Sequence, residues 1–175
     1  MDRRFELKPA TRGPEGATWE VAEVVVDGNN LVDLLRELER PLAEAEGGLV
    51  EAGGYDGLPA SLAFFPSRYY LGEPPKYSVA PGYPLGKIPV LGCNCGEVDC
   101  NPFLARISVT EKTVVWSEFE NFWRGPHSRT GKSIWTYERL GDLTFNRSQY
   151  EAALGSYRPP LPAESSFWKR VRRHR

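Results

Sequence analysis

Residues 103–119 read FLARISVTEKTVVWSEF, and this stretch decides the fold class. Its two halves, 103–109 and 113–119, are rich in β-branched and aromatic residues, and the polar residues Thr110, Glu111 and Lys112 separate them. Two such runs joined by a short polar connection are typical of a β-hairpin. The sequence therefore predicts a sheet that is mostly antiparallel.

A strand and a helix are expected before this hairpin. Residues 19–26, WEVAEVVV, have the composition of a strand, and Asp27-Gly28 indicates a tight turn after it. Asn30 can cap a helix whose leucines recur at helical spacing until Pro41 interrupts the pattern. We expect this helix over 31–40, with room for a further turn towards Gly47.

The remaining segments complete a prediction of one α+β domain over residues 1–157. Residues 47–86 are rich in glycine, proline and aromatic residues, which favours loops and short strands whose aromatic rings cover the core. Asn146 and Gly155 flank a second helix over 147–154. Further strands are expected over 87–92, 134–137 and 143–145.

Composition narrows the class of protein. The chain has 175 residues, 22 Lys and Arg against 23 Asp and Glu, and 41% apolar residues. Such a composition excludes wholesale disorder, and the length suits a single domain. No apolar stretch approaches the length of a transmembrane helix or forms a signal peptide at the start, so a cytoplasmic protein is expected.

The charge is unevenly distributed. Residues 158–175 carry six basic residues against one glutamate, so this segment is +5 and the other 157 residues are −6. Aromatic residues interleave with the basic ones, as in segments that bind nucleic acid or an anionic surface. The residues that would make this contact are Lys169, Arg170, Arg172 and Arg173. The alternative is a flexible, solvated terminus.

The segment GCNCGEVDC, residues 92–100, brings three cysteines together with the spacing C-x-C-x4-C. Thiolates are preferred ligands of zinc, which takes four ligands at a structural site. His127 is the natural fourth ligand of Cys93, Cys95 and Cys100, because the chain has two histidines and the other lies in the basic tail. This Cys3His set predicts a closed, structural zinc site in a non-enzymatic binding or structural module, with a protein as one class of partner.

Two other interpretations of the same residues remain open. The cysteines can be ordinary reduced thiols at a turn. They can also serve a thiol-dependent enzyme in which Cys95 or Cys100 is the nucleophile and His127 the base. The neighbouring carboxylates, Glu118 and Glu120 among them, are expected to be solvated surface groups.

Several of these motifs occur together in one known pattern. The run IPVLGCNCGEVDCNPFLARI (88–107), the strand Val115-Trp116-Ser117, the pair Pro126-His127 and the helix LTFNRSQYEAAL (143–154) resemble a family of uncharacterised bacterial proteins. The resemblance covers about residues 86–155 and implies no known activity. Its pattern has glycine where this chain has Asp99, and often an aromatic residue at Asn101. The resemblance places the three cysteines and His127 in one pattern.

Overall fold

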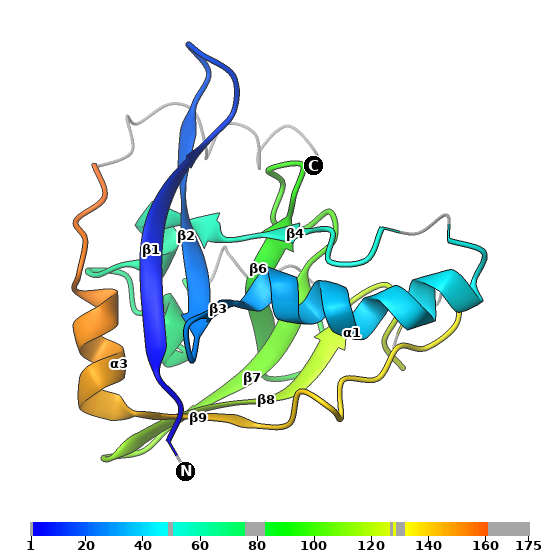
Figure 1. Cartoon of the computed structure of the whole chain (residues 1–175). Helices are drawn as coiled ribbons and strands as arrows, with labels where there is room; N and C mark the ends of the chain where they lie inside the picture. Colours follow the sequence, from blue (N-terminus) through cyan, green and yellow to red (C-terminus); the bar gives the residue numbers. More distant parts are fainter. Residues whose placement is uncertain (1, 49–50, 76–82, 127, 129–131, 161–175) are drawn as a thin grey trace.

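The computed structural model describes residues 2–48, 51–75, 83–126, 128 and 132–160. These residues form a single α+β domain with two antiparallel sheets and three α-helices (Figure 1). The predicted fold class is confirmed. Within the described ranges, no helix has the length and apolar composition needed to cross a membrane.

The first sheet is built on the hairpin of β1 (Phe5–Arg12) and β2 (Trp19–Val26). Phe5 lies opposite Val26 and Arg12 lies opposite Trp19, so the two strands pair along their whole length. Two short strands, β3 (Asn29–Asn30) and β5 (Leu58–Pro59), also pair with β2. The strand predicted over 19–26 is confirmed, whereas the sequence analysis did not identify β1.

The second sheet contains the predicted hairpin at its centre. Its strands are β4 (Tyr55–Asp56), β6 (Lys87–Cys93), β7 (Phe103–Val109), β8 (Thr113–Asn121) and β9 (Leu143–Asn146), in that order. The hairpin turn is closed by the N–H of Thr110, which donates to the carbonyl of Thr113 at 2.9 Å. The strand predicted over 134–137 is wrong, because the Trp135 N–H donates to the Arg124 carbonyl at 2.9 Å and joins no strand.

The two sheets are joined to each other at two places. Residues 55–59 pair with β6 through Tyr55 and Asp56, and then with β2 through Leu58 and Pro59. At the other end, Arg3 forms a bridge to Phe145 of β9 just before β1 begins. Both connections hold the two sheets around one shared core.

Helix α1 (Leu31–Ala45) follows the first sheet and is longer than predicted. The Asn30 side chain caps it by accepting the N–H of Val32 at 2.9 Å, as expected for an asparagine at this position. Pro41 lacks an N–H and so removes one helical hydrogen bond, but the helix continues through it to Ala45. Three shorter helical segments follow: α2 (Ala60–Ala63), the 3₁₀ turn η1 (Tyr69–Leu71) and α3 (Arg147–Leu154).

The core centres on a cluster of aromatic rings between the sheets and α3. Trp116 of β8 is fully buried, and its indole N–H donates to the hydroxyl of Tyr150 at 3.0 Å. That hydroxyl in turn donates to the carbonyl of Tyr70 at 2.7 Å. The Phe5 and Tyr150 rings stack with centroids 4.2 Å apart. The buried tryptophan and tyrosine thus satisfy their polar atoms without water.

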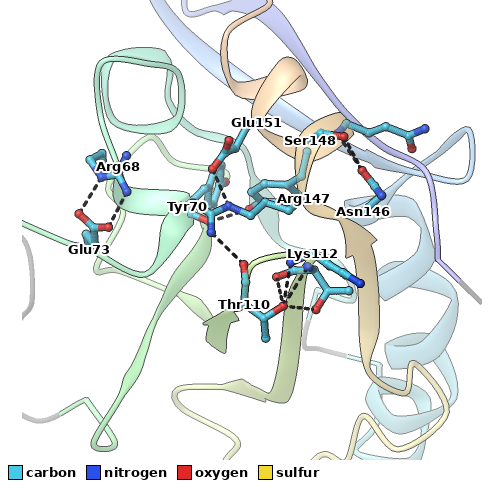
Figure 2. A network of polar contacts seen from close by, with 12 residues as sticks. Arg68, Tyr70, Glu73, Thr110, Lys112, Asn146, Arg147, Ser148 and Glu151 are labelled. Carbon is cyan, nitrogen blue, oxygen red and sulfur yellow. Dashed lines mark hydrogen bonds and ion pairs between the residues drawn. The ribbon is translucent and has the colours of Figure 1, made fainter.

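Helix α3, which lies beside β1, is fixed to the β7–β8 hairpin by Arg147 (Figures 1 and 2). The Arg147 backbone N–H donates to the carbonyl of Lys112, and its Nη1 donates to the carbonyl of Thr110, both at 2.9 Å. Nε of the same guanidinium pairs with Glu151 one turn along the helix, at 2.9 Å. These bonds join α3 to the hairpin turn, at the end of β7 opposite the one where β6 leads into the cysteine loop.

Candidate metal centre

The cysteine loop, residues 93–100, connects the end of β6 to the approach to β7. Cys93 is the last residue of β6 and lies opposite Tyr55 of β4. The N–H of Gly96 donates to the Cys93 carbonyl at 3.0 Å, and the N–H of Cys100 donates to the Glu97 carbonyl at 3.2 Å. Gly96 has φ of +93°, a backbone conformation that glycine adopts without steric cost. These turns fold the loop back on itself.

The folded loop brings its three thiols together. The Sγ atoms of Cys93, Cys95 and Cys100 all lie within 4.8 Å of one another, and none of them forms a disulfide. Cys93 is buried, whereas Cys95 and Cys100 are exposed. Zinc binds thiolates at about 2.3 Å, which places two sulfurs of a tetrahedral site about 3.8 Å apart. The longest pair must therefore shorten by no more than about 1 Å for all three to bind one ion.

The thiols have different proton affinities. Burial raises the pKa of Cys93 to about 12. The pKa of Cys95 is lowered from its usual value, mainly because the backbone N–H of Glu97 donates to its sulfur. A metal binds thiolates, so binding at this loop has to displace protons and weakens as the pH falls.

Neighbouring elements hold the loop in place. The N–H of Asn94 donates to the Gly54 carbonyl at 3.3 Å. On one side, the ring of Trp19 lies so close to Gly96 that an added Cβ would come within 3.2 Å of it. On the other side, the indole N–H of Trp123 donates to the Cys100 carbonyl at 2.6 Å. Glycine at position 96 is thus favoured by its positive φ, and it also leaves room for the Trp19 ring.

A buried polar network lies behind the loop, centred on Glu39 of α1. The Glu39 side chain is 1% exposed and accepts hydrogen bonds from the hydroxyls of Tyr55 and Tyr137, both at 2.6 Å, and from the N–H of Gly53 at 2.7 Å. Its pKa is raised by burial, which outweighs the opposing effect of these three donors. The network gives a buried carboxylate the partners that it needs.

The network continues from Glu39 towards the cysteine loop. The Asn121 amide donates to the Tyr55 hydroxyl at 2.7 Å and to the Asn101 side chain at 3.1 Å. Asn101 directly follows Cys100 and donates to the Gly54 carbonyl at 3.4 Å. A continuous chain of hydrogen bonds therefore joins helix α1 to the end of the cysteine loop.

Sequence reasoning missed this network, although one signal for it exists. The buried residues of α1 are Leu31, Leu35, Glu39 and Ala43, so a glutamate occupies the apolar stripe at regular four-residue spacing. A charged residue in such a stripe indicates a buried partner. Glu120 is a second exception: it was expected at the surface, but it is 2% exposed and pairs with Lys87 at 2.6 Å.

Of the predicted site residues, the structure brings together the three cysteines. His127, the predicted fourth ligand, lies outside the described residues, and its position relative to the thiols stays a prediction. The basic tail also lies outside them from residue 161 onwards. The predicted contact residues Lys169, Arg170, Arg172 and Arg173 are therefore not tested.

Comparisons with protein-family models, with curated proteins and with solved structures gave no match for this chain. The resemblance to a family of uncharacterised bacterial proteins stays a prediction. The geometry of the cysteine loop is consequently the basis on which a function can be argued: three thiols that could hold one metal ion.

Proposed function

We propose that this chain is a non-enzymatic structural or binding module in which the cysteine loop holds one zinc ion. The observation that carries the proposal is the convergence of three Sγ atoms within 4.8 Å of one another in a short, hydrogen-bonded loop. These three thiols are the only cysteine side chains in the sequence. Thiolate ligands favour zinc, copper(I) and iron–sulfur clusters over hard cations.

Zinc fits this set better than an iron–sulfur cluster does. An iron–sulfur cluster usually requires four thiolates, and the chain has three cysteines. Zinc accepts three thiolates with one nitrogen ligand, for which His127 is the proposed donor. Four protein ligands leave no coordination position for water, so such a site is structural rather than catalytic.

A metal ion bound here would stabilise the connection between β6 and β7. Cys93 ends β6, and Cys100 lies three residues before the start of β7. The turns within this loop are closed by backbone hydrogen bonds of 3.0–3.4 Å. Since the ion binds the folded loop more tightly than the unfolded chain, its binding free energy contributes to folding.

Thermal unfolding with and without a chelator tests the proposal. The metal-loaded protein is expected to melt at a clearly higher temperature than the protein treated with EDTA, and added zinc should restore the original melt. Cys93→Ser and Cys100→Ser should each abolish the response to the chelator. Ser108→Ala, a change at an exposed residue of β7 outside the loop, serves as the matched control and should keep the response to the chelator.

Alkylation with iodoacetamide separates the proposal from a thiol-dependent enzyme. A metal site protects all three thiols together until the chelator is added. A single fast-reacting cysteine, whether or not the chelator is present, would instead support the enzyme that uses Cys95 or Cys100 with His127 as its base. An unchanged melt in EDTA together with such reactivity would overturn the zinc proposal.

A further inference from the structure

A pocket of about 250 Å³ opens beside the cysteine loop. This volume is below the usual range for drug-sized ligands, so the pocket suits a small molecule. Its lining includes two cationic side chains, one carboxylate, two indole rings and one of the three cysteines: Arg124, Lys132, Glu51, Trp123, Trp135 and Cys93.

Arg124 is the distinctive group of this pocket. Its side chain is 5% exposed, and its guanidinium lies over the Trp135 ring at 4.8 Å from the centroid. Nη1 donates to Glu46, whose other carboxylate oxygen accepts the Trp135 indole N–H at 2.9 Å. The Nε and Nη2 atoms make no hydrogen bond to any described residue, which leaves one two-pronged edge of the guanidinium unused.

Part of the Arg124 side chain faces the pocket, because Arg124 is one of its lining residues although the side chain as a whole is nearly buried. Nε and Nη2 are the donors of this guanidinium that no described residue accepts. An anionic acceptor in the pocket would pair with these charged donors more strongly than a neutral acceptor does.

The geometry of a guanidinium indicates which anion. Its Nε and Nη2 donors are parallel and match the two oxygens of a carboxylate. Arg12 shows that a second carboxylate on one arginine is compatible with this fold: its Nε and Nη2 bind Asp56 at 2.8 and 3.0 Å, and its Nη2 also binds Glu23 at 2.6 Å.

We infer that the pocket binds a small organic carboxylate on the Nε–Nη2 edge of Arg124. Lys132 adds a second positive charge to the lining, against the single negative charge of Glu51. The indole of Trp123, which is 39% exposed, offers an apolar surface to the rest of the molecule. The pocket shares Cys93 with the proposed metal site. Carboxylate binding at Arg124 does not depend on the proposed zinc ion.

The test measures the binding of acetate, benzoate and inorganic phosphate to the full chain by NMR, following the Arg124 Nε–H and the tryptophan indole signals. Benzoate is expected to bind saturably and to shift the Arg124 signal, whereas its neutral analogue benzamide should not. The titrations are run on metal-loaded and on chelator-treated protein, so that loss of the metal site and absence of the carboxylate site give different results.

Variants show whether Arg124 binds the carboxylate. Arg124→Lys keeps the charge next to Glu46 but loses the two-pronged edge, and should weaken benzoate binding roughly tenfold or more. Arg68→Gln, which removes a surface arginine paired with Glu73, should bind benzoate as the unchanged chain does. Equal binding of benzamide, unchanged binding by a folded Arg124→Lys variant, binding of phosphate alone or no binding of either carboxylate would each overturn the inference.

Discussion

Replacing Tyr137 by phenylalanine removes one donor from the buried carboxylate of Glu39. The Tyr137 hydroxyl donates to Glu39 Oε1 at 2.6 Å, and the tyrosine ring is 6% exposed, so water cannot readily replace the lost donor. A hydrogen bond to a buried charged group contributes about 1.5–3 kcal/mol. We therefore expect Tyr137→Phe to lower the free energy of unfolding by about 2 kcal/mol at neutral pH, equivalent to a drop in Tm of about 4–8 °C for a domain of this size.

The loss of stability caused by Tyr137→Phe should depend on pH. Burial raises the pKa of Glu39 above its ordinary value of 4.5, so the carboxylate takes up a proton at a higher pH in the folded protein than in the unfolded chain. Once Glu39 is neutral, the missing hydroxyl costs only as much as a neutral hydrogen bond, about 1 kcal/mol. The difference between variant and unchanged chain should thus shrink as the pH falls through the folded pKa.

Urea denaturation of both chains at neutral and acidic pH measures this difference. Tyr157→Phe is the matched control, because the Tyr157 hydroxyl also donates to a carboxylate, that of Glu20 at 2.8 Å, but from a half-buried ring. The control should lower the free energy of unfolding by less than about 1 kcal/mol, which is at most about half of the Tyr137→Phe effect. Equal costs for the two variants, or a Tyr137→Phe cost independent of pH, would refute the account of the buried network.

Three further predictions concern other positions. Glu39→Gln should remove a pH dependence of the free energy of unfolding. The stabilising contribution of Glu39 is fully present below about pH 4.5 and is lost as the pH rises through the raised pKa of the folded protein. Stability curves of the two chains against pH should therefore diverge above that pKa. Asn30→Ala should cost about 1 kcal/mol in urea denaturation, because it removes the cap of α1. Gly125→Ala should lower the Tm, since its Cβ would lie 2.0 Å from Glu120 Oε1 and displace the partner of Lys87; an unchanged Tm would contradict this.

Local patterns were enough to predict the central elements of the fold. The hairpin of β7 and β8 and the helix α1 follow from residue types and spacings within short windows. Strand β1 was missed because its sequence, FELKPATR, has two buried apolar residues, Phe5 and Leu7, before Lys8 and Pro9 interrupt the alternation. Its pairing with β2 supplies what its own sequence does not indicate.

Tertiary contacts explain the errors elsewhere. Residues 134–137 have strand-forming side chains, but the rings of Trp135 and Tyr137 are buried through bonds to Glu46 and Glu39 rather than through a strand ladder. Glu39 and its partner Tyr137 are 98 residues apart in the chain. No local pattern can reveal such a pair, although a glutamate on the apolar stripe of α1 indicates that a partner exists.

The candidate site was predictable for a different reason. Three cysteines within eight residues can meet through a single local turn, so their spacing alone indicated a common site. What the spacing could not indicate was their support by Trp19, Trp123 and the hydrogen-bonded chain from Glu39, because these groups come from distant parts of the sequence.

The metal content of the full chain, purified untagged under reducing conditions without chelator, tests the central claim most directly. Elemental analysis is run beside the double variant Cys93→Ser, His127→Ala, whose folding is checked by circular dichroism. The account predicts about one zinc ion per chain in the unchanged protein and none in the folded variant. No metal in the unchanged protein, or the same zinc content in the variant, would contradict it.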